Sequence, residues 1–75
     1  METYVFKLNG RYAVIGHHNH VSHVDHPLDA SRFTKDQALI MKHGKAYSRA
    51  IVGQHKELKD HDIVCLNITI MESTL

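Results

Sequence analysis

Histidine is the residue type that gives this chain its most distinctive chemistry. Eight of the 75 residues are histidine, and five of these lie in the segment His17–His26, which reads HHNHVSHVDH. Neutral imidazole is a ligand for Zn²⁺, Ni²⁺ and Cu²⁺, and imidazole is also the side chain whose charge changes near neutral pH. The segment therefore indicates a metal site, a response to pH, or a solvated loop with no chemical role.

The spacing of these histidines decides which of them could share a metal ion. In an extended chain, residues two apart point to the same side, so His18 and His20 would project together about 6–7 Å apart. A structural zinc site needs four protein ligands. The candidate ligands are His18, His20, His23 and His26. We favour solvated histidines and no cofactor; the alternative is weak binding of zinc or another divalent transition metal.

The other reactive side chains do not point to an enzyme. Cys65 is the only cysteine, and a nucleophile would need a neighbouring base that the sequence does not place. The four glycines are isolated, so no glycine-rich phosphate loop is present. So short a chain also offers little concave volume for a substrate. We therefore predict no catalytic residues.

Composition narrows the classes of partner. The formal net charge of +1 argues against a dedicated nucleic-acid binder. A basic row at seven-residue steps would suit phosphates only if one long helix carried it: Lys35, Lys42, Arg49 and Lys56. No apolar run approaches the ~20 residues that span a bilayer, and a lone cysteine is consistent with a reducing compartment. We predict a cytoplasmic protein with no membrane partner.

Two strands and a tight turn are predicted before the histidine segment. Thr3–Leu8 is rich in β-forming residues, and Arg11–Ile15 returns as a second strand. Asn9 and Gly10 between them are a strong hairpin signal, because both residues tolerate the positive φ of a type I′ turn. The histidine segment that follows is predicted to be either a long loop or a polar strand at the sheet edge.

A helix is predicted from Thr34 to Gly44. Thr34 is a good N-cap, Gln37 has the capping-box spacing, and Gly44 is a typical C-terminal stop. Beyond Gly44 two interpretations stay open: a strand near Arg49–Gly53 with a charged loop, or continued helix. We favour the break, because a helix from Thr34 to Leu58 would be about 37 Å long, more than a small sheet can cover.

The clearest strand pattern lies near the carboxyl end, where Val64, Leu66, Ile68 and Ile70 alternate with Cys65, Asn67 and Thr69. The first set is predicted to face the helix. The fold class is thus α+β: a small antiparallel sheet of three to five strands with one helix on one face, in a single domain of residues 1–75. The predicted core is Tyr4, Phe6, Leu8, Val14, Phe33, Ala38, Met41, Val64, Leu66, Ile68 and Ile70.

One stretch resembles a known group of proteins. After the Asn-Gly hairpin, Ala30-Ser31-Arg32-Phe33-Thr34 and Ala38 fit the pattern A-x-x-F-(S/T)-x-x-x-A. This resembles small uncharacterised phage and prophage proteins, in which such a segment leads from a β-meander into one helix and a final strand. The resemblance covers roughly the first 45 residues. It implies a phage accessory protein that contacts a host protein.

Taken together, these features favour a small non-enzymatic protein-interaction or regulatory module. A homodimer formed through a sheet edge is a further expectation, because unpaired strand edges are common contact sites. The alternative is a metal- or pH-responsive binding protein that uses the histidine segment.

Overall fold

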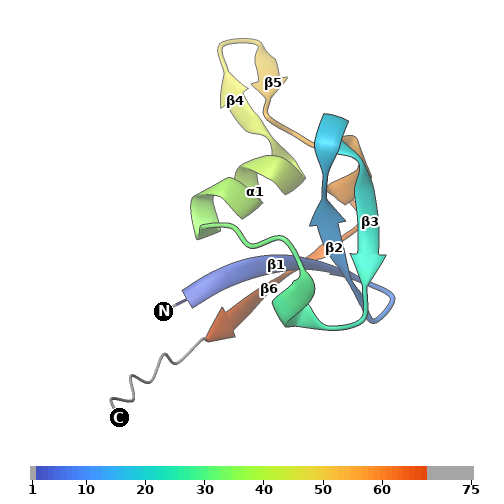
Figure 1. Cartoon of the computed structure of the whole chain (residues 1–75). Helices are drawn as coiled ribbons and strands as arrows, with labels where there is room; N and C mark the ends of the chain where they lie inside the picture. The colour runs from blue at the N-terminus through green and yellow to red at the C-terminus, as the bar shows by residue number, and fades with distance from the viewer. Residues whose placement is uncertain (1, 68–75) are drawn as a thin grey trace.

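The computed structural model describes residues 2–67, which form a small α+β fold (Figure 1). These residues contain an antiparallel sheet in the order β3-β2-β1-β6 and one α-helix, α1. The sheet strands are β1 (Glu2–Leu8), β2 (Arg11–Ile15), β3 (Val21–Val24) and β6 (Asp62–Asn67), and the helix is α1 (Lys35–His43). A separate hairpin is made by β4 (Lys45–Tyr47) and β5 (Ala50–Val52), and the 3₁₀ turns are η1 (His17–Asn19), η2 (Pro27–Asp29) and η3 (Lys56–Leu58). The predicted fold class is confirmed.

The first hairpin forms as its sequence predicts, and its two strands then separate. Asn9 and Gly10 have φ values of 51° and 80°, the positive angles that the turn requires. β1 and β2 pair directly only next to this turn, where Lys7 lies opposite Tyr12 and Leu8 lies opposite Arg11. Further along, the segment Ser31–Phe33 fills the gap, so the chain just before the helix becomes part of the sheet.

Backbone hydrogen bonds show how this segment joins both strands. On the β1 side, Tyr4 and Phe33 exchange two backbone hydrogen bonds of 2.9 Å each. On the β2 side, the Ser31 amide donates to the Ala13 carbonyl at 3.1 Å, and the Ile15 amide donates to Ser31 Oγ at 2.8 Å. The start of α1 is therefore fixed to the sheet before the first helical turn.

The core lies between α1, η3 and the face of the sheet that carries Phe6 and Ala13. Phe6, Ala13, Ala38 and Leu58 form a fully buried cluster. Phe33 packs against Phe6 edge-to-face, with ring centres 5.6 Å apart and planes at 63°, a geometry that aromatic pairs prefer. Phe6 and Ala38 confirm the predicted core, as do Tyr4, Phe33 and Met41, which pack against the cluster. Leu8 and Val14 are partly buried outside it.

The predicted orientation of the last strand is wrong. In the β1–β6 register, Phe6 lies opposite Ile63 and Val5 lies opposite Val64, and residues directly opposite one another in a sheet share a face. Ile63 therefore faces the core with Phe6, whereas Val64 and Leu66 lie on the other face with Val5. Apolar and polar residues do alternate along this strand, but Ile63 is an apolar residue on the face opposite to that of Val64 and Leu66. The pairing with β1 turns the face of Ile63 towards the core. The predicted core positions 68 and 70 lie outside the described residues.

The helix begins and ends where its capping residues predict. Thr34 Oγ1 accepts from the Gln37 amide at 3.2 Å, and Gln37 Oε1 accepts from the Thr34 amide at 3.0 Å, which completes a capping box. Gly44 ends the helix with φ 78°, and its amide donates to the Ile40 carbonyl. The favoured break at Gly44 is confirmed. Within residues 2–67, no helix is long and apolar enough to cross a membrane.

Replacing Gly44 with alanine should destabilise the fold more than replacing Gly10 with alanine. Both glycines have positive φ, 78° and 80°, so both substitutions strain the backbone; Gly44, with ψ 169°, lies in a region that is essentially restricted to glycine, where the strain is about 1–3 kcal/mol. A Cβ at Gly44 would also overlap Ile51 Cγ2 and lie 3.2 Å from Gln54 Cβ, whereas one at Gly10 meets no atom within 4 Å. Urea unfolding should show an additional loss of about 1–3 kcal/mol for Gly44→Ala. Equal losses would contradict the seating of β5 on the helix end.

Candidate functional site

The β4–β5 hairpin projects beyond α1, away from the four-stranded sheet (Figure 1). All six strand residues of this hairpin are exposed. Tyr47 is 71% exposed, Ile51 67% and Val52 48%. Strand pairing places Tyr47 and Val52 on one face of the hairpin and Ile51 on the other. In the part of the chain that the structure describes, both faces thus present apolar side chains to solvent.

A shallow hollow of about 400 Å³ adjoins the hairpin at the carboxyl end of α1. Its lining residues are Asp36, Leu39, Ile40, His43, Gly44 and Lys45. Leu39 is 40% exposed, and Ile51 lies directly over Gly44. The hollow therefore continues the apolar side chains of the hairpin onto the helix. We call Leu39, Tyr47, Ile51 and Val52 together the hairpin surface.

The charges around the hairpin surface are mostly positive. Between Gly44 and Gln54 the chain carries Lys45 and Arg49 and no acidic residue, and Lys42 lies in the last turn of α1. Asp36, one helical turn before Ile40, is the acidic residue that lines the hollow. An apolar centre surrounded mainly by cations is typical of a surface that binds a partner with acidic residues around an apolar patch.

The histidine segment does not form the extended array that its spacing suggested. His18 lies in η1 with φ 57°, so His18 and His20 do not alternate along one strand, and both are exposed. His26 uses Nδ1 to accept a hydrogen bond from the Leu28 amide at 3.1 Å. His23 lies on β3, which confirms the edge-strand alternative for part of the segment.

The four predicted ligands therefore occupy different settings. Among residues 2–67, no three histidine, cysteine, aspartate or glutamate side chains come together in a way that could hold a metal ion. The structure instead pairs His23 with a histidine that sequence reasoning did not single out, His61. Metal binding by the histidine segment stays a prediction that the described residues do not support with an assembled site.

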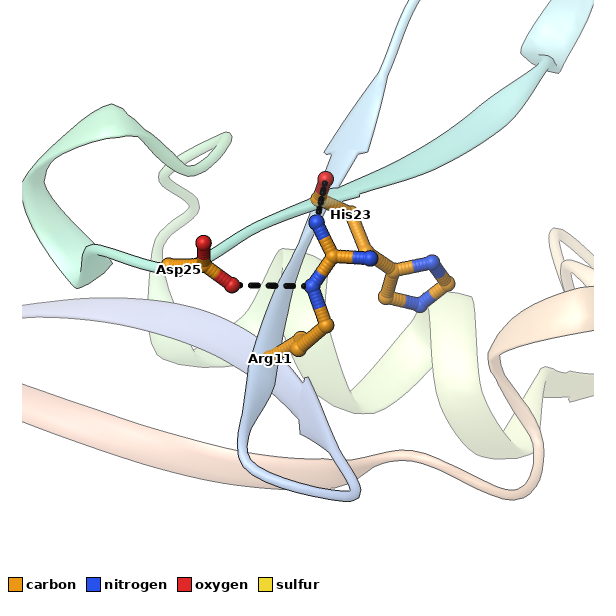
Figure 2. A network of polar contacts seen from close by, with 3 residues as sticks. All are labelled: Arg11, His23 and Asp25. Atoms are coloured by element: carbon orange, nitrogen blue, oxygen red, sulfur yellow. Dashed lines mark hydrogen bonds and ion pairs between the residues drawn. The ribbon is translucent and has the colours of Figure 1, made fainter.

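The backbone of β3 at His23 is held by an arginine on the neighbouring strand (Figure 2). Arg11 Nε donates to Asp25 Oδ1 at 3.0 Å, and a second guanidinium nitrogen donates to the His23 carbonyl at 3.0 Å. Both charged side chains are more than half exposed, so the ion pair adds little to global stability. Its structural effect is local, since it fixes the end of the strand from which the His23 ring projects.

The rings of His23 and His61 meet end to end. Their Nε2 atoms are 2.8 Å apart, the ring planes differ by 10°, and the ring centres are 5.1 Å apart. The distance between the ring centres equals the Nε2–Nε2 distance plus the radius of each ring. Both nitrogens therefore lie on the line between the ring centres, and the two rings are nearly coplanar. This is the geometry of an N–H···N hydrogen bond, in which one ring donates from Nε2 and the other accepts.

His61 is a buried polar residue at the edge of the core. It is 2% exposed, and the Phe6 ring meets it edge-to-face at 6.5 Å and 85°. Its Nδ1 is buried and has no hydrogen-bond partner among the described residues. Burial lowers the pKa of His61, and His23 and Lys42 lower it further, while the Glu57 carbonyl and Asp60 raise it. The ring is therefore kept neutral at pH values where an exposed imidazole is partly charged.

A second histidine, His55, anchors the start of the segment that ends at His61. His55 Nε2 donates to the Asn19 carbonyl at 2.9 Å, and the His55 amide donates to the Met41 carbonyl at 2.8 Å. Gln54 Nε2 donates to the Lys42 carbonyl at 3.0 Å. We call residues Gln54–His61 the strap: it runs from the end of the hairpin to the start of β6, with Leu58 fully buried between its two histidines.

No protein-family model, curated protein or solved structure matches the chain. Sequence reasoning missed the His23–His61 pair because the two residues are 38 positions apart and nothing local links them. It also missed Leu58, which was assigned to a charged loop. The sequence did offer one indication of a buried Leu58: it is the single apolar residue in the run Lys56–Asp62, as expected for a short turn that is anchored by one side chain.

Acid should destabilise the protein partly through His61. The unfolded ring has the ordinary pKa of about 6.5 and the folded ring a lower one, so the unfolded state binds the proton more readily. The contribution of neutral His61 to stability is therefore fully present above the unfolded pKa and is lost as pH falls towards the folded pKa. In urea titrations at pH ~7.5 and ~5.5, the wild type should lose more unfolding free energy than His61→Phe, which keeps an aromatic ring beside Phe6.

The exposed residue His20 provides the matched control. His20→Gln removes one histidine without touching the core, so its loss of stability in acid should equal that of the wild type. His61→Phe leaves the other seven histidines in place, so the comparison removes one imidazole, that of His61, together with its contact with His23. Equal acid sensitivity of the wild type and His61→Phe would contradict the lowered pKa.

Proposed function

We propose that this chain is a small non-enzymatic protein-interaction module that docks onto another protein through the hairpin surface. One observation carries the proposal: Tyr47, Ile51 and Val52 are among the most exposed large apolar side chains of residues 2–67, and they lie together on one projecting hairpin. Scattered exposed apolar residues are normal, whereas a group of them on one projection marks a contact site.

The energetics of a short hairpin support this reading. A two-stranded hairpin with water on both faces is marginally stable by itself, and here it is held at its base by Gly44 and Gln54. Full burial of an apolar side chain of this size contributes about 1.5–3 kcal/mol. Docking that covers Ile51 and Val52 would thus stabilise both the complex and the hairpin itself. Tyr47 has the amphipathic ring that is enriched at the centres of interfaces.

The charges define the chemistry of the partner. Lys45 and Arg49 surround the apolar centre, so the complementary surface is an apolar patch with acidic residues around it. Two copies of this hairpin would bring these like charges together, which disfavours self-association through it. Exposed Ile51 and Val52 suit a protein surface better than a phosphate backbone. The resemblance to phage accessory proteins, carried by residues 30–38, would make the partner a host protein.

The second candidate is a pH-responsive binding module, the regulatory alternative suggested by the abundance of histidine. The observation that favours it is the half-buried contact between His23 and the buried His61, because only neutral or singly protonated pairs can make that hydrogen bond. A metal-responsive module has no comparable support in residues 2–67, where no three potential ligands come together.

The docking proposal is tested by photocrosslinking in extract of the cells that produce the protein. A benzophenone amino acid in place of Tyr47 should give a discrete adduct with one protein, whereas the same group in place of exposed His20 should not. Ile51→Glu should reduce the Tyr47 adduct about tenfold, the effect of losing ~1.4 kcal/mol of binding free energy. Arg49→Glu should also reduce it, because the partner is expected to be acidic.

Leu28 provides the matched control substitution. It is 50% exposed and lies in η2, outside the hairpin surface, so Leu28→Glu adds the same charge to another apolar site and should leave the adduct unchanged. Equal losses for Ile51→Glu and Leu28→Glu would contradict docking through the hairpin. An adduct between two copies of the chain would instead identify the surface as a homodimer contact.

A further inference from the structure

We propose that the strap regulates the hairpin surface: the His23–His61 contact holds the strap closed, and protonation of both rings opens it and weakens docking. This inference rests on the proposed function for its consequence, but the opening itself is a property of the isolated chain. It gives the histidine segment a role that does not need a metal, since Asn19 and His23 provide two of the points to which the strap is attached.

The strap and the hairpin are mechanically connected. β5 ends at Val52 and the strap begins two residues later, at Gln54. Gln54 and His55 fasten it to the last carbonyls of α1, at Lys42 and Met41. With these bonds made, Ile51 is fixed over Gly44 beside the hollow. If the strap leaves, only the connection through Gly44 holds the hairpin to the helix, and Ile51 and Val52 no longer have a set position relative to Leu39.

The contact at the far end of the strap depends on proton count. One proton between the two Nε2 atoms makes the hydrogen bond, whichever ring carries it. With a proton on each Nε2, two N–H groups and two positive charges face each other at 2.8 Å, so the rings must separate. The buried Nδ1 of His61 makes no well-formed hydrogen bond in residues 2–67, so apart from the favourable Glu57 carbonyl a charged ring would have no good acceptor for its second N–H.

The groups that face His61 from each element determine how it responds. His23 on β3 and Lys42 on α1 oppose a positive charge on the ring, while Asp60 in the strap and the Glu57 carbonyl favour it. Phe6 on β1 presents an apolar edge that provides no solvation. Two cationic neighbours, burial and an aromatic contact outweigh one exposed carboxylate and one carbonyl. Protonation of His61 is therefore better tolerated with the strap open than closed.

Opening has a cost that keeps it a minor state. Leu58 lies in the middle of the strap and is fully buried with Phe6, Ala13 and Ala38, so complete release removes a core side chain. Each unit by which the pKa of His61 is lowered changes the open-to-closed ratio tenfold once both states are titrated. Acid therefore raises the population of the open strap without unfolding the sheet, and docking weakens in proportion to the closed fraction.

Hydrogen exchange measured amide by amide tests the opening on the isolated chain, with a chelator present so that only protons vary. The reporters are the strap amides of His55, Leu58 and His61, which donate to Met41, His55 and Leu58 at 2.8, 3.0 and 3.0 Å. After correction for the chemical exchange rate, they should exchange about threefold faster or more at pH ~5.5 than at ~7.5. The Tyr4 amide of β1, which donates to the Phe33 carbonyl, should be more strongly protected than the strap amides at both pH values, because only global unfolding releases it.

Three variants make the result specific. His61→Phe should remove the pH effect on the strap. His23→Gln should reduce it even if His61→Phe does not fold, because the Gln amide oxygen can accept from a protonated His61. His20→Gln should behave as the wild type. Strap amides that are as strongly protected as Tyr4 at both pH values, or an acid effect that persists in His61→Phe, would overturn the proposal.

The Tyr47 crosslink at the two pH values separates this proposal from the docking proposal. A yield that falls in acid for the wild type and stays constant for His61→Phe supports regulation by the strap. Constant yield in both, with faster strap exchange, would overturn the regulation and leave docking intact. Absence of any adduct at either pH contradicts docking, and exchange then decides the opening alone.

Discussion

The burial of Phe6 in the middle of β1 is the packing constraint on which the other elements depend. Its ring meets Phe33, from the segment Ser31–Phe33 that lies between β1 and β2, and His61 from the strap, both edge-to-face. It is also part of the fully buried cluster with Ala38 and Leu58. Sheet, helix and strap thus cover one aromatic side chain.

A core this small makes a buried histidine costly as well as useful. A 75-residue chain buries only about 60% of its unfolded surface, so its stability margin is narrow. Leaving His61 Nδ1 unpaired in the interior costs about 1–3 kcal/mol by general experience with buried polar groups. An apolar residue at this position would pack against Phe6 without that penalty. A residue that lowers stability in this way fits a regulatory role better than a purely structural one.

Local signals predicted the parts of the fold that local chemistry decides. Asn9-Gly10 specified the hairpin, and Thr34 with Gln37 and Gly44 specified both ends of the helix, because turn and cap geometries depend on residues a few positions apart. The orientation of β6 was mispredicted because Ile63, Val64 and Leu66 offer apolar residues in both phases, and only pairing with β1 selects one. The His23–His61 pair was beyond prediction for the same reason, since the two residues are 38 positions apart and meet only when β3 and the strap come together in the folded chain.

The location of the candidate binding surface follows from the small size of the core around Phe6. With the core gathered around Phe6, no apolar layer in residues 2–67 covers the β4–β5 hairpin, which is held only at its base by Gly44 and the first residues of the strap. The strap that fixes this base is the same segment that places Leu58 in the core and ends at His61. In the regulation that we propose, a change at the His23–His61 contact reaches the hairpin through the eight residues of the strap. Coupling between a titratable contact and an exposed apolar surface thus needs no separate allosteric element in this fold.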